Sequence, residues 1–219
     1  MKKIALMVMV IYSLLLLTLT LPVVFLFVHS DNFSSVISGV FSYAGYWIFL
    51  FVFIIAQGVM LVVPVKIENK RPITKKIIFL PVIVTGFLIA MLFFGSICSL
   101  YEFIFYNPGF NNNFELFFVL TACGLIWLWW SLFFSGRLND FLPNNIVLTQ
   151  CDKLMKSSVM MLLIAVPVHI IARNRDYCCA GFFTFIGITF GIAVMLFSFG
   201  PGVFFLYADR WKKLHPEKK

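Results

Sequence analysis

The chain has 219 residues, of which 62% are hydrophobic and only 12% are charged. Soluble domains contain about 45–50% apolar and about 25% charged residues, so this composition excludes an ordinary soluble domain. The net charge of +8 does not indicate nucleic-acid binding, because the basic residues form short clusters at the ends of apolar blocks instead of lining one face. The composition predicts an integral membrane protein.

The apolar blocks have the length of membrane-spanning helices, for which about 18 residues are enough. They lack the short alternating pattern of a membrane β-barrel. The sequence therefore predicts an all-α integral membrane bundle of about six transmembrane helices that forms one domain over residues 1–219. The predicted spans cover residues 4–28, 36–65, 77–101, 114–135, 159–172 and 177–208.

The first block, residues 4–28, follows the basic start "MKK". It is longer than the apolar core of a signal peptide, which has about 7–15 residues, and no A-x-A cleavage site follows it. We therefore expect it to remain as the first span.

The loops between the blocks differ in charge. The loop "KIENKRPITKK" has five basic residues and one acid, whereas the linker "EFIFYNPGFNNN" has no Lys or Arg. With both termini in the cytoplasm, 15 of the 17 Lys and Arg residues and five of the nine acids lie inside. The net charge is then +10 inside (15 − 5) and −2 outside (2 − 4), as the positive-inside rule requires.

The fifth block, residues 159–172, has only 14 residues. A helix of that length reaches about 21 Å, less than the hydrocarbon core of about 30 Å. Either it is a partial span that lines a wet cavity, or the long side chains of Arg173 and Arg175 extend to the outer headgroups. The polar stretch before it, residues 136–158, is expected to be a cytoplasmic linker.

The stretch "HIIARNRDYCC", residues 169–179, begins in the last four residues of this block and holds the two basic residues expected outside. We take it as the candidate functional cluster. Arg173 and Asp176 are close enough in sequence to pair. One interpretation is an interfacial turn that pins two helices and binds anionic headgroups; the other is a functional charged site. The cluster consists of His169, Arg173, Arg175, Asp176, Cys178 and Cys179.

The sixth block carries small residues at intervals of three or four, which places them on one helical stripe. Such stripes are typical of tight helix–helix contacts, and "GITFG" is a GxxxG match. A pore lining is the alternative. The proline that follows predicts a kink or a hinge near the end of the helix. The stripe and hinge consist of Gly181, Thr184, Gly187, Gly191, Ser198, Gly200, Pro201 and Gly202.

No catalytic, metal-binding or cofactor-binding motif is present, and no cofactor is assigned. The favoured hypothesis is a non-enzymatic subunit or scaffold of a membrane complex, because packing features dominate. One alternative is a small transporter or channel for an anionic solute or lipid, and another is a membrane enzyme with an outer His/Cys site. Expected partners are the lipid bilayer and a homo- or hetero-oligomeric membrane partner, without nucleic acid. Short loops favour a bacterial-type plasma membrane.

Overall fold

A computed structural model describes residues 2–27, 44–68, 75–105, 110, 112–136, 143–176 and 180–214. In this part of the chain all regular structure is α-helical, as predicted, and it forms six helices. They are α1 (Lys2–Phe27), α3 (Ala44–Glu68), α4 (Lys75–Phe105), α5 (Asn113–Gly136), α6 (Pro143–Arg173) and α7 (Phe182–Leu214).

Four of the helices are long and apolar enough to cross a membrane. Their apolar segments have 22–27 residues, and 22 residues of helix already cover about 33 Å. The helices α1 and α3, of 26 and 25 residues, contain shorter apolar stretches, Lys3–Thr18 and Tyr46–Val62. The segments in α4, α5, α6 and α7 are Phe79–Phe105, Asn113–Phe134, Val147–Arg173 and Phe182–Ala208.

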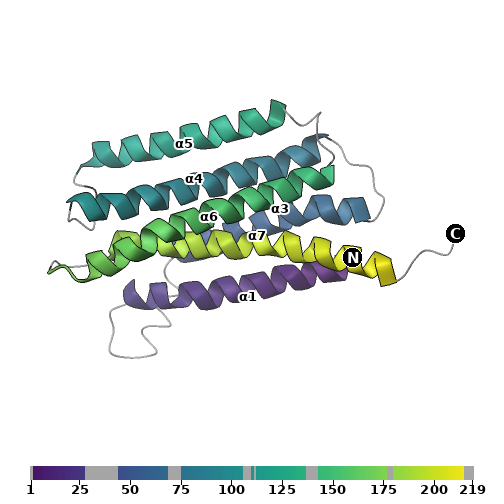
Figure 1. The fold of residues 1–219 in the computed structure, drawn as a ribbon, viewed down its shortest axis with the longest axis horizontal. Helices are drawn as coiled ribbons and strands as arrows, with labels where there is room; N and C mark the ends of the chain where they lie inside the picture. Colours follow the sequence, from purple (N-terminus) through teal and green to yellow (C-terminus); the bar gives the residue numbers. More distant parts are fainter. Residues whose placement is uncertain are drawn as a thin grey trace.

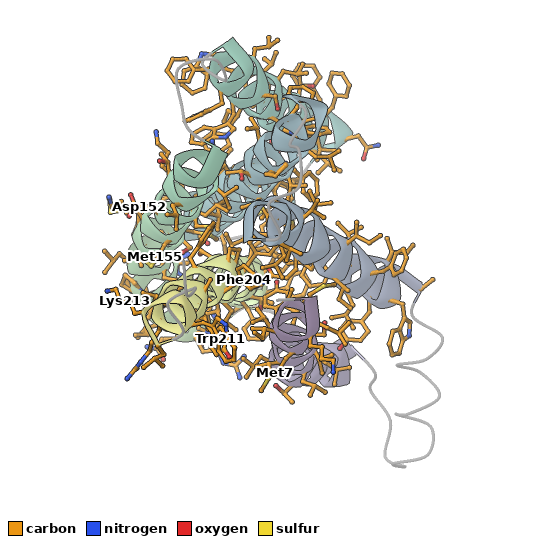
Figure 2. The ribbon with its side chains drawn as sticks, turned by 90° about the vertical axis from the view of Figure 1, so that its right-hand side faces the viewer. Met7, Asp152, Met155, Phe204, Trp211 and Lys213 are labelled. Carbon is orange, nitrogen blue, oxygen red and sulfur yellow. The ribbon has the colours of Figure 1, made fainter. Side chains whose placement is uncertain are left out.

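The helices run side by side, and successive helices alternate in direction (Figure 1). The start of α1 and the end of α7 therefore lie together, at what we call the termini end; α4 ends and α7 begins at the opposite end. The helix α7 contacts α1, α3, α4 and α6, whereas α5 lies at the edge and packs mainly against α4. Figure 2 looks onto the termini end, where Phe204 lies inside the bundle and Asp152 and Lys213 lie at its rim.

The interior is filled by large side chains from several helices, among them Leu16, Phe53, Leu154 and Phe197, all fully buried. Many apolar side chains instead point outward, including Leu128, which is 58% exposed. In a bilayer these side chains face acyl chains, so their exposure carries no cost. This distribution is the one that a membrane bundle requires.

The helix α6 is not the short span that we expected at residues 159–172. It begins at Pro143 and has 31 residues, because residues 143–158 of the stretch taken for a linker are also helical. There Val147, Cys151 and Leu154 are buried against the bundle. Lys156 and Asp152 form an exposed ion pair there, at 2.6 Å. The spanning segment is therefore of full length.

The other predicted spans differ from the helices mainly at their ends. The first part of the span 36–65 lies outside the described residues, and so do residues 177–179 of the last predicted span. The helix α7 continues without interruption through Pro201 to Leu214.

Candidate functional site

A buried acidic side chain connects α4 to α7 at the opposite end of the bundle. Glu102 lies in the last turn of α4 and is fully buried. Its Oε1 accepts the Gly181 N–H at 2.6 Å, and its Oε2 accepts the Thr184 N–H at 2.8 Å. The first N–H groups of a helix have no partner within the helix, and the helix dipole favours a carboxyl there. Glu102 therefore caps the start of α7 from a neighbouring helix.

Arg175 caps α4 in return. It lies in the turn after α6, and its Nη1 and Nη2 donate to the carbonyls of Glu102 and Phe103 at 2.9 and 3.0 Å. These carbonyls belong to the last turn of α4, where helical partners are missing. The guanidinium also lies over the Phe103 ring, at 5.4 Å from its centroid. One side chain thus ties the α6–α7 connection to α4.

His169 completes the network from the end of α6. Its Nδ1 lies 2.8 Å from the Thr184 Oγ1, and that hydroxyl donates to the Gly181 carbonyl at 2.9 Å. A hydroxyl has one proton, so Nδ1–H donates to Thr184 in this arrangement. The three helices α4, α6 and α7 therefore meet in one connected set of hydrogen bonds.

Gly181 occupies a position in this network that other residues fit poorly. Its φ of +88° lies in the left-handed region, which glycine adopts without strain. A Cβ there would also lie 3.0 Å from the His169 Cε1. Glycine allows the chain to turn into α7 directly beneath the imidazole ring.

The structure separates the residues of the predicted cluster. His169 and Arg175 belong to the network, whereas Arg173 and Asp176 are exposed. The expected ion pair between Arg173 and Asp176 is not among those formed by the described residues. Cys178 and Cys179 lie outside the described residues.

Glu102 is the site residue that the sequence analysis missed. We ended the third span at Tyr101 and assigned Glu102 to the outer linker. The buried face of α4 nevertheless includes Leu92, Gly95 and Ser99, which are three or four residues apart, and one more such interval reaches Glu102. Extending the stripe by one turn would have placed the carboxyl on the packed face.

Most residues of the predicted small-residue stripe are buried in α7; Gly202 is half-buried. Gly187 lies against α4, because a Cβ built on Gly95 would be 3.2 Å from the Gly187 Cα. A Cβ on Gly191 would be 2.8 Å from the Leu162 side chain of α6. The glycines thus lie where α7 is closest to its neighbours.

The cysteines and histidine do not form a metal site in the part of the chain that the structure describes. No group of three His, Cys, Asp or Glu side chains lies there within reach of one ion. Cys98, Cys123 and Cys151 are free thiols.

The two pockets with described linings are apolar. One, of about 730 Å³, lies between α1 and α3 and is lined by residues such as Leu14, Trp47 and Phe51. The other, of about 370 Å³, lies between α4 and α5 and includes Cys123 and Gly124. Their linings suit acyl chains rather than a charged solute.

No family model, no curated protein and no solved structure matches this chain. The fold and the composition define a helical membrane protein.

The two arginines of the predicted cluster should differ in their effect on stability. Arg175→Met removes a charged donor from two helix-end carbonyls, and we expect the free energy of unfolding to fall by about 1–3 kcal/mol. Arg173→Met is the matched control and should change it by less than about 0.5 kcal/mol, since the side chain is exposed. Thermal unfolding in detergent measures both, and equal shifts would contradict the capping role.

Proposed function

We propose that this protein is a non-enzymatic, multi-pass subunit or scaffold of a membrane complex. The observation that supports this function is that the charged side chains of the network at the opposite end bind the ends of helices. The carboxyl of Glu102 and the guanidinium of Arg175 both bind main-chain groups at helix ends. Polar side chains that join helices to one another serve rigidity, which a scaffold needs.

A transporter for an anionic solute has less support. That hypothesis depends on a short fifth span, a break at Gly200–Gly202 and two outward-facing arginines, Arg173 and Arg175. The helix α6 has 31 residues, α7 continues through Pro201, and Arg175 is bound to α4. Of the two arginines, Arg173 alone is exposed.

We place the termini end in the cytoplasm of a bacterial-type plasma membrane. Basic side chains at this end include Lys3, Arg210 and Lys213, and the Lys153 ammonium lies against Phe134 in the last turn of α5, as the positive-inside rule favours. A topology reporter fused after Asn69 should then be active as an inside fusion, and one fused after Asn112 as an outside fusion. The reverse pattern would contradict this orientation.

Co-purification tests the proposed function. The tagged chain is extracted from its native membrane in a mild detergent, and a second copy with a different tag is expressed with it to detect self-association. We expect a stoichiometric complex, with either a second copy or another membrane protein, that survives size-exclusion chromatography. An unrelated multi-pass protein with the same tag is the control. A stably folded monomer without any associated protein would count against a subunit or scaffold.

A further inference from the structure

The helix α1 lies at one edge of the bundle (Figure 1), and an apolar groove of about 730 Å³ runs between it and α3. Pockets that bind small molecules have similar volumes, about 300–1,000 Å³. Several side chains that line the groove are more than half exposed, so no described part of the chain covers them: Leu6 and Val10 of α1, and Ile48 and Phe51 of α3. The groove is therefore accessible to a molecule from the bilayer.

The groove suits an apolar occupant. None of the described residues that line it is charged, and the one hydroxyl among them, that of Ser13, already donates to the Met9 carbonyl at 2.8 Å. An acyl chain would fill such a groove by van der Waals contact without leaving a buried polar group unpaired. In a membrane the candidates are an acyl chain and the apolar face of another helix.

The length of the groove favours an acyl chain. Along α1 it extends from Leu6 to Leu17, which are 11 residues apart (17 − 6), or about 16 Å along the helix axis. One leaflet has about half of the hydrocarbon thickness of about 30 Å, which is about 15 Å. A transmembrane helix packed along α1 would cross both leaflets, whereas an acyl chain occupies one.

A basic side chain lies at the end of the groove that is nearer the termini end. Four residues of its lining follow one another at intervals of three or four and so share one face of α1: Leu6, Val10, Ser13 and Leu17. Lys3 is three residues before Leu6 and continues this face, and its side chain is exposed. A positive charge at one end of an apolar groove complements a phospholipid with an anionic headgroup.

The depth of Lys3 in the bundle matches that of a headgroup. Ala5 of α1 and Phe204 of α7 belong to one buried cluster and so lie at a similar depth. The spanning segment of α7 ends at Ala208, four residues or about 6 Å beyond Phe204. Lys3 is two residues, or about 3 Å, from Ala5 in the same direction, because α1 and α7 are antiparallel. From there a lysine side chain reaches the membrane surface.

We propose that the groove between α1 and α3 binds one acyl chain of an anionic phospholipid, with Lys3 against the headgroup phosphate. The acyl chain lies along Leu6 and Val10 toward Leu17, in the leaflet at the termini end. The site does not depend on whether the protein is a subunit or scaffold of a complex.

Lipid titration tests the preference for an anionic headgroup. The delipidated protein is titrated with phosphatidylglycerol or with phosphatidylcholine of the same acyl chains, and bound lipid is counted by native mass spectrometry. We expect one phosphatidylglycerol per chain, bound about fivefold more tightly than phosphatidylcholine, because one basic side chain near the surface contributes about this factor. Equal binding of the two lipids would overturn the proposal.

Lys3→Gln should remove this preference and leave the binding of phosphatidylcholine unchanged. Lys213→Gln is the matched control, because Lys213 is exposed near the same end but belongs to α7, which does not line the groove. It should keep the preference. A preference that persists in Lys3→Gln, or that is lost equally in both variants, would mean that the headgroup does not lie at Lys3.

Filling the groove tests the place of the acyl chain. Val10→Trp puts an indole into the groove, and we expect the binding of phosphatidylglycerol to weaken at least about tenfold, since each methylene that loses its contact costs about a factor of four. Ile11→Trp is the matched control: Ile11 is 46% exposed and Val10 51%, but Ile11 does not line the groove. Its binding should stay within about twofold of the wild type. Equal binding by the two variants would overturn the site.

The same pair of variants distinguishes a lipid from a second copy of the chain. Two differently tagged copies are expressed together, and their association is measured by co-purification. If a lipid occupies the groove, Val10→Trp and Ile11→Trp should associate to the same extent as the wild type. If Val10→Trp alone abolishes association, a second copy covers the groove and the lipid site is wrong.

Discussion

Replacing Glu102 with alanine is expected to lower the free energy of unfolding by about 2–6 kcal/mol, because two buried N–H groups lose their acceptor and each costs about 1–3 kcal/mol. The donors belong to Gly181 and Thr184 at the start of α7, and both bonds are buried. The substitution also removes a side-chain tie between α4 and α7. Thermal unfolding of the purified protein in detergent measures the loss.

Two further variants define the cause. Glu102→Gln keeps one acceptor oxygen but turns an NH₂ group toward an N–H, so we expect a smaller, intermediate loss. Asp152→Asn is the matched acidic control: its pair with Lys156 is exposed, and such pairs contribute about 0.3–0.5 kcal/mol. If Glu102→Ala and Asp152→Asn had equal effects, the capping role of Glu102 would be wrong.

The spans predicted from the sequence agree with the helices where a whole helix is apolar. Residues 114–135 correspond to α5 (Asn113–Gly136), and residues 4–28 to α1 (Lys2–Phe27). Hydropathy marks membrane depth, however, and not the end of a helix. The helix α6 therefore began earlier than predicted, at Pro143.

Polar residues in the first turns of α6 pack against aromatic rings, which hydropathy cannot detect. The Gln150 Oε1 accepts the Trp130 indole N–H at 3.2 Å. The Lys153 ammonium lies 5.4 Å from the Trp130 ring centroid and 5.0 Å from that of Phe134. These contacts come from α5, so they depend on tertiary structure and leave no periodic signal in α6 itself.

The candidate site could be predicted only in part, because its contacts also depend on tertiary structure. The charged stretch at the end of α6 identified His169 and Arg175 as polar groups near a membrane surface. Their partners could not be read from the sequence, because Arg175 binds main-chain carbonyls of Glu102 and Phe103. Backbone groups carry no residue-specific signal. Arg173 and Arg175 consequently looked equivalent, although only Arg175 reaches the end of α4.

A second large loss of stability is expected at the glycine contact between α4 and α7. In Gly187→Ala the new Cβ would lie 2.5 Å from the Ser99 Oγ, 3.0 Å from the Gly95 carbonyl oxygen and 3.1 Å from the Met161 Cε. The carbonyl belongs to the backbone of α4, so the helices must separate. Overpacking of this kind costs about 1–3 kcal/mol, and thermal unfolding in detergent should report that loss.

Gly124 in α5 is the matched control, because a Cβ there would meet nothing within 4 Å. Gly124→Ala should leave the free energy of unfolding unchanged or raise it by up to about 1 kcal/mol, since alanine favours a helix more than glycine does. Ser99→Ala combined with Gly187→Ala removes the contact with Oγ but not the one with the Gly95 carbonyl, so stability should return only in part. Full recovery would mean that the new Cβ overlaps only with the Ser99 hydroxyl. Equal stability of Gly187→Ala and Gly124→Ala would mean that the packing of α4 against α7 does not depend on close approach of their backbones.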